Sequence, residues 1–388
     1  MTSFIFTRNT IRWMLFCLTF SACIEPYDTT LTDQNLYILV VDGFFVPNDT
    51  TRITLSRTTT IDYVGEARRE SVAAVHIESD QGATYVLTSK GDGTFTLPPV
   101  NADLKSKYRL RINSWEGPVY TSDFVDIKAN HILDSLTWTE EQVDADVIAF
   151  QIYAHDPTNS TQHYYWTYDE TWQYVSNDHS IYYFKEGQII PRKSAEELYY
   201  CWKTLSNQDY FLGNTSSLGQ DVVYDYRLVE FLQTDIKFYF GYSMNVKQYG
   251  ISNGGFSYWQ SIKKNSQNLG SLFDPLPSQP TSNLICSNEP GRKVVGYFDA
   301  SLVKTQRVFF RRQAIKGPGE KYDPTGYETC GPEFLLPADM DEAHLRNKLI
   351  VEPKFNDDGE LIGYEVEREE CVDCRFHGGS VTKPDYWN

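Results

Sequence analysis

The chain has 388 residues, a formal net charge of −17 and an aromatic content of 15%. This length is enough for two or three domains. The acidic balance argues against nucleic acid as a partner, because nucleic-acid binding requires a basic surface, and against electrostatic attachment to anionic lipids. Many aromatic residues within strand-like segments are typical of exported β-proteins, in which rings pack on pleated, half-buried surfaces.

The first residues have the pattern of a secretory signal peptide. Arg8 and Arg12 form a short basic region with no acid nearby, and residues 13–20 are almost wholly apolar. This apolar run is too short to span a bilayer, which takes about 20 residues. A basic region followed by a short apolar run and small residues is the signature of a segment that is removed from the mature protein.

Ser21 and Ala22 lead directly to Cys23, and this ending is similar to a bacterial lipobox, in which the cysteine is lipidated and becomes the mature N-terminus. We therefore predict a lipoprotein signal peptide over residues 1–22 and a lipidated, polar tether over residues 23–34. Several acyl chains on one cysteine would hold the protein on a membrane stably, since each buried CH₂ adds about 0.8 kcal/mol. The alternative is an ordinary signal peptide that contains a cysteine.

Residues 35–128 contain a series of short strand patterns. In the segment AAVHIES, Val75 and Ile77 alternate with polar residues, and TYVLTSKGDGTFTL has a Gly-Asp-Gly turn at residues 91–93 between two β-rich arms. Strands that recur about every 8–12 residues with turn signals between them indicate an antiparallel β-sandwich. We therefore predict a mainly β chain whose first domain, residues 35–128, is an immunoglobulin-like or transthyretin-like sandwich.

Residues 129–388 are predicted to form a larger β-rich domain with a few short helices and a tail held by disulfide bonds. The clearest helix pattern covers residues 257–270, in which apolar residues fall near one face and a glycine follows as a stop. Residues 338–350 indicate a second short helix, and residues 194–198 a single helical turn. The sequence Asp-Asp-Gly at residues 357–359 predicts a hairpin turn.

Several motifs along the mature chain occur in an order that resembles a known family. They are LVVDGFF, AAVHIESDQGATYVL, GTFTLPP, KYRLRI, VYTSDFV, YYCWKT, YSMNVKQYGIS, YWQSIKKNSQNLGSLFDPLPSQPTSNL, GYFDAS and CVDCRFHGGSVTKPDYW. Together they span nearly the whole mature chain. Their order resembles the Bacteroidota lipoprotein family of domain of unknown function 4249.

The resemblance implies an outer-membrane, surface-exposed lipoprotein. Genes of this family often lie beside starch-utilisation-type transporters, which consist of a TonB-dependent barrel and a lid lipoprotein. The resemblance implies no established catalytic activity and no agreed functional residues. We therefore expect a non-enzymatic accessory or ligand-binding subunit of a nutrient-uptake complex for peptides or glycans. The alternative is a protein–protein scaffold in outer-membrane protein assembly or surface lipoprotein export.

The segment GISNG, residues 250–254, matches the nucleophile-elbow pattern G-x-S-x-G with Ser252 as the nucleophile, and His344 and His377 follow downstream. An α/β-hydrolase would place this elbow in a mostly parallel sheet with alternating helices, whereas the surrounding segments indicate antiparallel strands. The helix pattern also begins a few residues after the motif, whereas an elbow turns straight into its helix. We therefore favour a strand-to-helix loop over a serine hydrolase.

Metal-binding patterns are weak in this sequence. The seven histidines form no H-E-x-x-H motif or other close metal-binding pair. Residues 356–360, NDDGE, have some features of a calcium loop, but they lack its alternating ligands and its terminal glutamate. We expect no metal and no cofactor other than the covalent lipid anchor.

The segment YYWTYDETWQY, residues 164–174, is unusually rich in aromatic residues. Because side chains alternate along a strand, both faces of this strand carry rings, and Trp166, Tyr168 and Trp172 fall on the same face. One face must pack in the core, while the other can bind a ligand or partner, since exposed aromatic patches mark recognition surfaces. Trp166, Tyr168 and Trp172 are therefore candidate binding residues, with core or inter-domain packing as the alternative.

The mature chain has five cysteines besides the predicted lipidation site, and they are Cys201, Cys286, Cys330, Cys371 and Cys374. Beyond the inner membrane the environment is oxidising, so disulfide bonds are expected, and an odd number leaves one thiol free. The C-x-x-C motif near the C-terminus follows a strand and leads into an extended tail, which disfavours redox or zinc chemistry. We predict that disulfide bonds hold this tail on the body with Trp387 buried.

The pairing of these cysteines stays open at the level of sequence. A bond from Cys330 to either Cys371 or Cys374 would close a loop of roughly 40 residues, for which the chain-entropy model gives about 4 kcal/mol. The other member of the C-x-x-C motif could then reach Cys201. Cys286 is the expected free thiol.

Overall fold

The computed structural model describes residues 37–60, 63–142, 145–193, 196–207, 209–267, 280–315 and 327–387. Cys23, with the rest of the predicted signal peptide and tether, lies outside the described residues, and so does part of the helical turn predicted at residues 194–198. The chain is mainly β, as predicted, and its strands form three units.

The N-terminal unit consists of two layers of short strands around one core. In β4, Val75 and Ile77 are fully buried, and in β8 the same is true of Leu110 and Ile112. Because successive residues of a strand point to opposite faces, this alternation gives each layer one apolar face. The first ten strands of the unit are β1 (Leu39–Phe45), β2 (Thr51–Arg57), β3 (Arg68–Arg69), β4 (Ala73–Ser79), β5 (Thr84–Val86), β6 (Thr88–Ser89), β7 (Thr94–Leu97), β8 (Lys107–Ser114), β9 (Val119–Ser122) and β10 (Val125–Lys128).

Three later strands complete the N-terminal unit, and they are β20 (Leu284–Cys286), β21 (Val294–Gly296) and β22 (Asp299–Ser301). β22 lies between β1 and β10 and runs parallel to both, β21 is parallel to β1, and β20 pairs with β9 in the other layer. Ala300 is buried in the same core as Leu39 and Tyr108. Residues 35–128 therefore do not form the unit alone, because part of the predicted second domain returns to it.

The central unit consists of a five-stranded sheet and a three-stranded sheet. The first has the order β16-β13-β19-β23 with β17 beside β13, and the second has the order β11-β12-β18. Phe150, Trp166, Tyr242 and Phe310 from both sheets are buried in one shared core. The strands are β11 (Ile132–Gln142), β12 (Asp146–His155), β13 (His163–Val175), β16 (Tyr200–Ser206), β17 (Phe211–Asn214), β18 (Val222–Leu232), β19 (Gly241–Gly250) and β23 (Lys304–Arg311).

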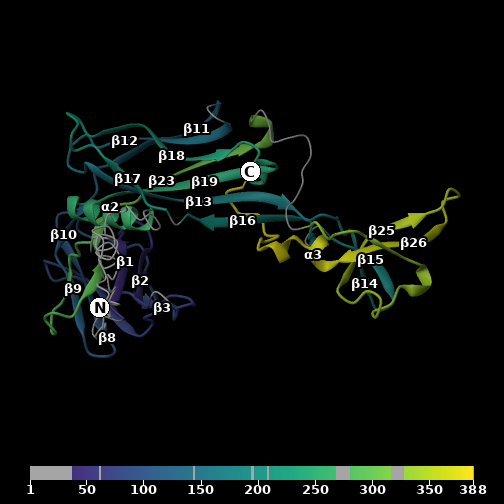
Figure 1. Cartoon of the computed structure of the whole chain (residues 1–388), viewed down its shortest axis with the longest axis horizontal. Helices are drawn as coiled ribbons and strands as arrows, with labels where there is room; N and C mark the ends of the chain where they lie inside the picture. The colour runs from purple at the N-terminus through teal and green to yellow at the C-terminus, as the bar shows by residue number, and fades with distance from the viewer. Residues whose placement is uncertain are drawn as a thin grey trace, which may run out of the picture.

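The distal unit lies at the opposite end of the longest axis from the N-terminal unit (Figure 1). Leu335, Ile350 and Val366 form its small core, against which Tyr182 packs. The predicted hairpin turn is present between β25 and β26, where Gly359 has a φ of 80° that favours glycine. The strands are β14 (Tyr182–Lys185), β15 (Gln188–Pro191), β24 (Glu333–Leu335), β25 (Lys348–Phe355) and β26 (Leu361–Arg368).

The predicted helices have different outcomes. Helix α2 (Asn253–Gln267) corresponds to the pattern at residues 257–270 but begins earlier. Residues 338–350 are not a helix: they contain a 3-10 turn, η6 (Pro337–Asp339), further turns and the start of β25. Ile350 pairs with Val366 in the hairpin, so strand pairing overrides the local helix preference. The other short helices are η4 (Ile236–Phe238), η5 (Arg312–Ala314), α3 (Glu369–Val372) and η7 (Cys374–His377).

Helix α2 lies between the N-terminal unit and the central sheets (Figure 1). Phe44 of β1 stacks on Tyr249 of β19 with ring centroids 5.1 Å apart, and Trp259 of α2 packs beside Phe44 and Tyr165. This aromatic cluster joins the two units. Within the described part of the chain, no helix is both long enough and apolar enough to cross a bilayer.

Candidate functional site

Trp166 and Tyr168 do not form the binding surface that the sequence suggested. Trp166 is fully buried and Tyr168 is 3% exposed, because both side chains face the three-stranded sheet from the middle of the five-stranded sheet. Rings in this position cannot contact a ligand while the core is folded, so the prediction is wrong for these two residues. Trp172 is partly buried and packs near Tyr174, between the core and the C-terminal tail.

Ser252 is the N-cap of α2. Its Oγ accepts a hydrogen bond from the Gly255 N–H at 3.0 Å and donates one to Oδ2 of Asp299 at 3.0 Å. The helix begins at Asn253, within the motif, which corrects the predicted gap, but the hydroxyl of Ser252 is engaged as a cap. His344 and His377 make their hydrogen bonds elsewhere, in the C-terminal part of the chain.

Among the described residues, no group of His, Cys, Asp and Glu could hold a metal ion.

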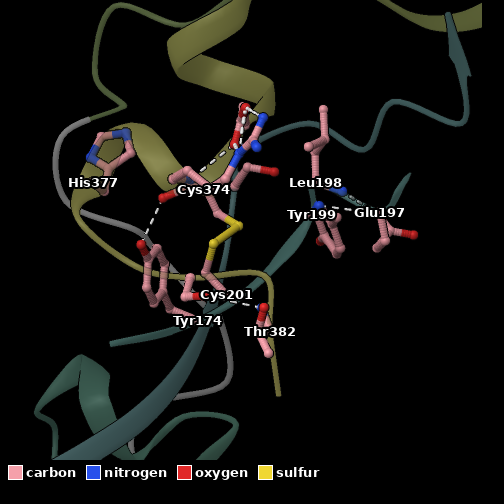
Figure 2. Close-up of a disulfide and its surroundings, with 12 residues drawn as sticks. Tyr174, Glu197, Leu198, Tyr199, Cys201, Cys374, His377 and Thr382 are labelled. Atoms are coloured by element: carbon pink, nitrogen blue, oxygen red, sulfur yellow. Dashed lines mark hydrogen bonds and ion pairs between the residues drawn. A yellow bond between two sulfur atoms is a disulfide. The ribbon is translucent and has the colours of Figure 1, made fainter. Parts of the chain in front are cut away.

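Two disulfide bonds hold the C-terminal tail. Cys330 is bonded to Cys371, and Cys201 is bonded to Cys374 (Figure 2). Cys286 is free and buried. The pairing resolves the alternatives that the sequence left open, since each cysteine of the C-x-x-C motif reaches a different distant segment.

Contacts around the Cys201–Cys374 bond hold the C-terminal tail on the edge of the central unit. The hydroxyl of Tyr174 donates a hydrogen bond to the carbonyl of Cys374 at 2.7 Å (Figure 2). Trp202 and Ser380 exchange two backbone hydrogen bonds of 2.9 Å. Trp387 is 5% exposed and packs edge-on against Phe309, so the predicted burial of Trp387 is confirmed.

A cleft between the N-terminal and central units is the best candidate for a binding site. It has a volume of about 460 Å³, within the range of small-ligand pockets, and such pockets often occur between domains. Its walls come from β1, β2, β13, β19 and the loop between β1 and β2. The lining residues are Asp42, Gly43, Phe44, Val46, Asp49, Thr50, Arg52, Thr54, Tyr165, Thr167, Lys247 and Tyr249.

The cleft carries both charged and aromatic groups. Nζ of Lys247 lies 3.1 Å from Oδ2 of Asp49, so this ion pair links the two units. Burial acts to raise the pKa of Asp49, but the Thr50 N–H and Lys247 outweigh it and lower that pKa, which keeps the carboxylate charged. Burial raises the pKa of Tyr249 to about 12, so its hydroxyl keeps its proton at neutral pH. These groups suit a polar ligand with apolar faces, such as a peptide or a sugar.

Sequence reasoning missed this cleft because its residues come from three segments far apart in the chain. Residues 42–54, 165–167 and 247–249 meet only when β1 and β2 lie against β13 and β19. The signal that was present, the ring-rich segment at residues 164–174, does include Tyr165, but the residues selected from it were on the buried face.

A family model described as "Domain of unknown function (DUF4249)" matches residues 24–307, which is more than half of the chain. The chain belongs to this family. All residues that line the cleft fall within the match, whereas the distal unit's strands β24, β25 and β26 and the C-x-x-C motif follow it. The match confirms the predicted membership of the family of domain of unknown function 4249.

Two of the solved structures that are similar to this DUF4249 chain have low sequence identity and low TM-scores. One is Escherichia coli alpha-2-macroglobulin activated by porcine elastase, with 14% identity, a TM-score of 0.18 and coverage of 56% of this chain and 19% of that chain. Another is the native conformation of the Escherichia coli protein, with 8% identity, a TM-score of 0.17 and coverage of 56% and 13%. At these scores the likeness carries no argument. A search of curated proteins finds no match.

Proposed function

We propose that this DUF4249 protein is a lipid-anchored outer-membrane lipoprotein that acts as a non-catalytic binding subunit of a TonB-dependent nutrient-uptake complex. It captures an oligopeptide or a glycan in the cleft between its N-terminal and central units. The two disulfide bonds support export, because such bonds persist in oxidising compartments. The lipobox-like ending at Cys23 supports the anchor, and the family resemblance supports the barrel and its lid lipoprotein as partners.

The observation that best supports binding of another protein is a row of exposed apolar side chains on the distal unit, which we call the distal apolar strip. It consists of Phe334, Phe355 and Leu361, which are 48%, 57% and 40% exposed. Phe355 lies directly opposite Leu361, and the ring of Phe334 lies over Gly363, so the three share one face of the sheet. Adjacent exposed apolar residues mark interaction sites.

The position of the distal apolar strip leaves the cleft free. The distal unit projects from the end of the molecule opposite the N-terminal unit (Figure 1). A barrel or lid protein bound to the strip would therefore not cover the cleft, and one molecule could hold a ligand and a partner together.

Affinity purification from detergent-solubilised outer membrane, followed by mass spectrometry, tests the proposal. The tagged protein should recover a TonB-dependent barrel with its lid lipoprotein. The variant Phe334→Ser, Phe355→Ser, Leu361→Ser should lose most of that recovery, whereas the control Val72→Ser, Val86→Ser, Leu218→Ser, which removes exposed apolar residues elsewhere, should retain it. Recovery of the protein without any barrel would count against the proposal.

A protein–protein scaffold in outer-membrane assembly or surface lipoprotein export is the second candidate, because the distal apolar strip would serve it equally well. The same purification separates the two functions: assembly or export components in place of the barrel would favour the scaffold. A serine hydrolase is not proposed, since the Ser252 hydroxyl is engaged as the cap of α2.

A further inference from the structure

A second pocket, separate from the cleft, lies at one end of the N-terminal unit. Its volume is about 810 Å³, which is the size of a small-molecule site. The ends of three neighbouring strands, in the order β1-β2-β3, and the segment 289–293 that leads into β21 form its walls. Five basic and three acidic residues line the pocket, and these are Arg57, Arg68, Arg69, Arg292, Lys293, Glu70, Glu116 and Glu289.

Strand pairing brings the basic residues together. Arg57 at the end of β2 lies directly opposite Arg68 at the start of β3. On its other side Arg57 lies opposite Leu39 of β1, which pairs with Val294, the residue after Lys293. Adjacent strands are only about 4.8 Å apart. The pairing therefore places the side chains of Arg57 and Arg68 on the same face of the sheet, next to each other.

The three carboxylates of the pocket are already engaged by two of the arginines. Oε2 of Glu70 lies 2.8 Å from Nε of Arg57, and Oε2 of Glu289 lies 3.0 Å from Nη1 of Arg292. Glu116 lies 3.5 Å from Arg292 and 3.6 Å from Arg57. The carboxylates of the pocket therefore form their ion pairs with Arg57 and Arg292 and not with the other three cations.

Within the described part of the chain, Arg68, Arg69 and Lys293 have no carboxylate at ion-pair distance. The guanidinium of Arg68 lies over the ring of Tyr37, 4.7 Å from its centroid, and Arg69 interacts electrostatically with Asp92. Five cations against three carboxylates give the pocket an excess of two positive charges, although the whole chain has a net charge of −17. The argument from overall charge against anionic partners therefore does not apply at this pocket.

Arg57 adds an unsatisfied donor at the base of the pocket. Its side chain is 10% exposed, and its Nη2 has no hydrogen-bond acceptor, since the carboxylate of Glu116 at 3.6 Å is too distant. A buried guanidinium donor without an acceptor costs stability. Glu116 is 44% exposed, so its side chain can move aside and let a ligand oxygen approach Nη2.

We propose that this pocket binds a phosphate group. A phosphate monoester carries a charge of about −1.5 to −2 and three strong acceptor oxygens, which matches the excess positive charge of the pocket and the donors of Arg57 and Arg68, whose positions in β2 and β3 lie directly opposite each other. Arginine binds phosphate in a bidentate manner. A single carboxylate would leave one of the two excess charges uncompensated. The phosphate can belong to a soluble ester or to a phospholipid headgroup, and the two sources are separable by experiment.

Isothermal titration of the full Cys23→Ser chain, which would carry no lipid, with glycerol 3-phosphate tests the soluble source. Flotation with phosphatidylcholine vesicles, with and without phosphatidic acid, tests the lipid source. The variant Arg68→Ser, Arg69→Ser, Lys293→Ser should weaken binding at least about tenfold, since charge-assisted hydrogen bonds are lost. The control Lys90→Ser, Lys105→Ser, Lys264→Ser removes the same charge from exposed positions elsewhere and should bind like the original chain.

Each outcome of these experiments decides a part of the proposal. Binding of glycerol 3-phosphate that the pocket variant loses supports a soluble ester, and binding of phosphatidic acid vesicles alone supports a headgroup. Equal affinity for succinate, equal binding by the pocket variant and the control, or no binding to either probe would overturn the proposal. None of these results depends on whether a barrel partner exists, so failure here and failure of the proposed function are distinguishable.

Discussion

The indole Nε1 of Trp166 donates a hydrogen bond to Oε1 of Gln248 at 2.9 Å, and both side chains are fully buried. This bond orients the amide, so that Nε2 of Gln248 donates to Nδ1 of His131 at 3.1 Å. Nε2 of His131 in turn lies 3.2 Å from Oγ of Ser301 in β22. The chain of contacts therefore links the central sheet to the N-terminal unit that forms the other wall of the cleft.

Gln248→Leu should destabilise the protein more than a typical surface change. The substitution keeps the size of the side chain but leaves the indole N–H of Trp166 and Nδ1 of His131 without partners, each at a cost of about 1–3 kcal/mol. Urea unfolding followed by tryptophan fluorescence measures the effect. The exposed change Gln220→Leu is the control, and equal stability of the two variants would show that the network contributes nothing.

His131 should make stability depend on pH. Burial, with a smaller contribution from Lys304, lowers the pKa of His131 from 6.5 to about 4. Between these values the unfolded chain binds a proton at this residue and the folded chain does not, so the free energy of unfolding falls as the pH falls, by roughly 3 kcal/mol in total. His131→Asn should abolish this slope, whereas His344→Asn, at an exposed site, should retain it.

Asp299 should make the free energy of unfolding change with pH in the opposite direction to His131. Burial, opposed by the hydrogen bonds from Ser252, raises the pKa of Asp299 from 3.8 to about 7. Between these values the folded chain holds a proton that the unfolded chain has released, so the stability from this group is complete at low pH and is lost as the pH rises through 7. Asp299→Asn should therefore gain stability relative to the original chain as the pH rises, by about 4 kcal/mol at most.

The effect of Asp299 on stability is measured from unfolding curves of the original chain and of Asp299→Asn between acidic and neutral pH. Asp126→Asn, at an exposed site, is the control. If the difference in free energy of unfolding between Asp299→Asn and the original chain stays constant with pH, the raised pKa of Asp299 is contradicted.

How far the sequence predicts this structure depends on the range of the interactions. Alternation such as Val75 and Ile77 is a local property, and it predicted the short N-terminal strands correctly. The return of β22 to a position beside β1 depends on pairing between residues more than 250 positions apart, so no local pattern could place it. The ring-rich strand β13 was recognised, but the side on which Trp166 packs is set by the three-stranded sheet.

The candidate sites were equally hard to predict from local sequence patterns. The cleft and the phosphate pocket are both built from residues distant in sequence, and Arg57 and Lys293 give no local signal of a shared site. The disulfide bonds were more accessible to sequence reasoning, because the compartment predicted from the N-terminus restricts the chemistry of cysteine.

The two disulfide bonds should protect different parts of the C-terminal region. Cys201 and Cys374 are 173 positions apart and Cys330 and Cys371 are 41 apart, for which the chain-entropy model gives about 5 and about 4 kcal/mol. In hydrogen-exchange measurements, Cys201→Ser, Cys374→Ser should lose protection around Trp202 and Ser380. Cys330→Ser, Cys371→Ser should loosen the distal unit more. Unchanged protection around Ser380 in the first variant would refute this role.

Native mass spectrometry of the complex purified from the outer membrane tests the central claim most directly. We predict an assembly that contains this chain and a TonB-dependent barrel, from which the chain is released with a mass that corresponds to a polypeptide beginning at an acylated Cys23. A chain that is released without acyl groups, or that is found alone under conditions that keep other barrel complexes intact, would contradict the account.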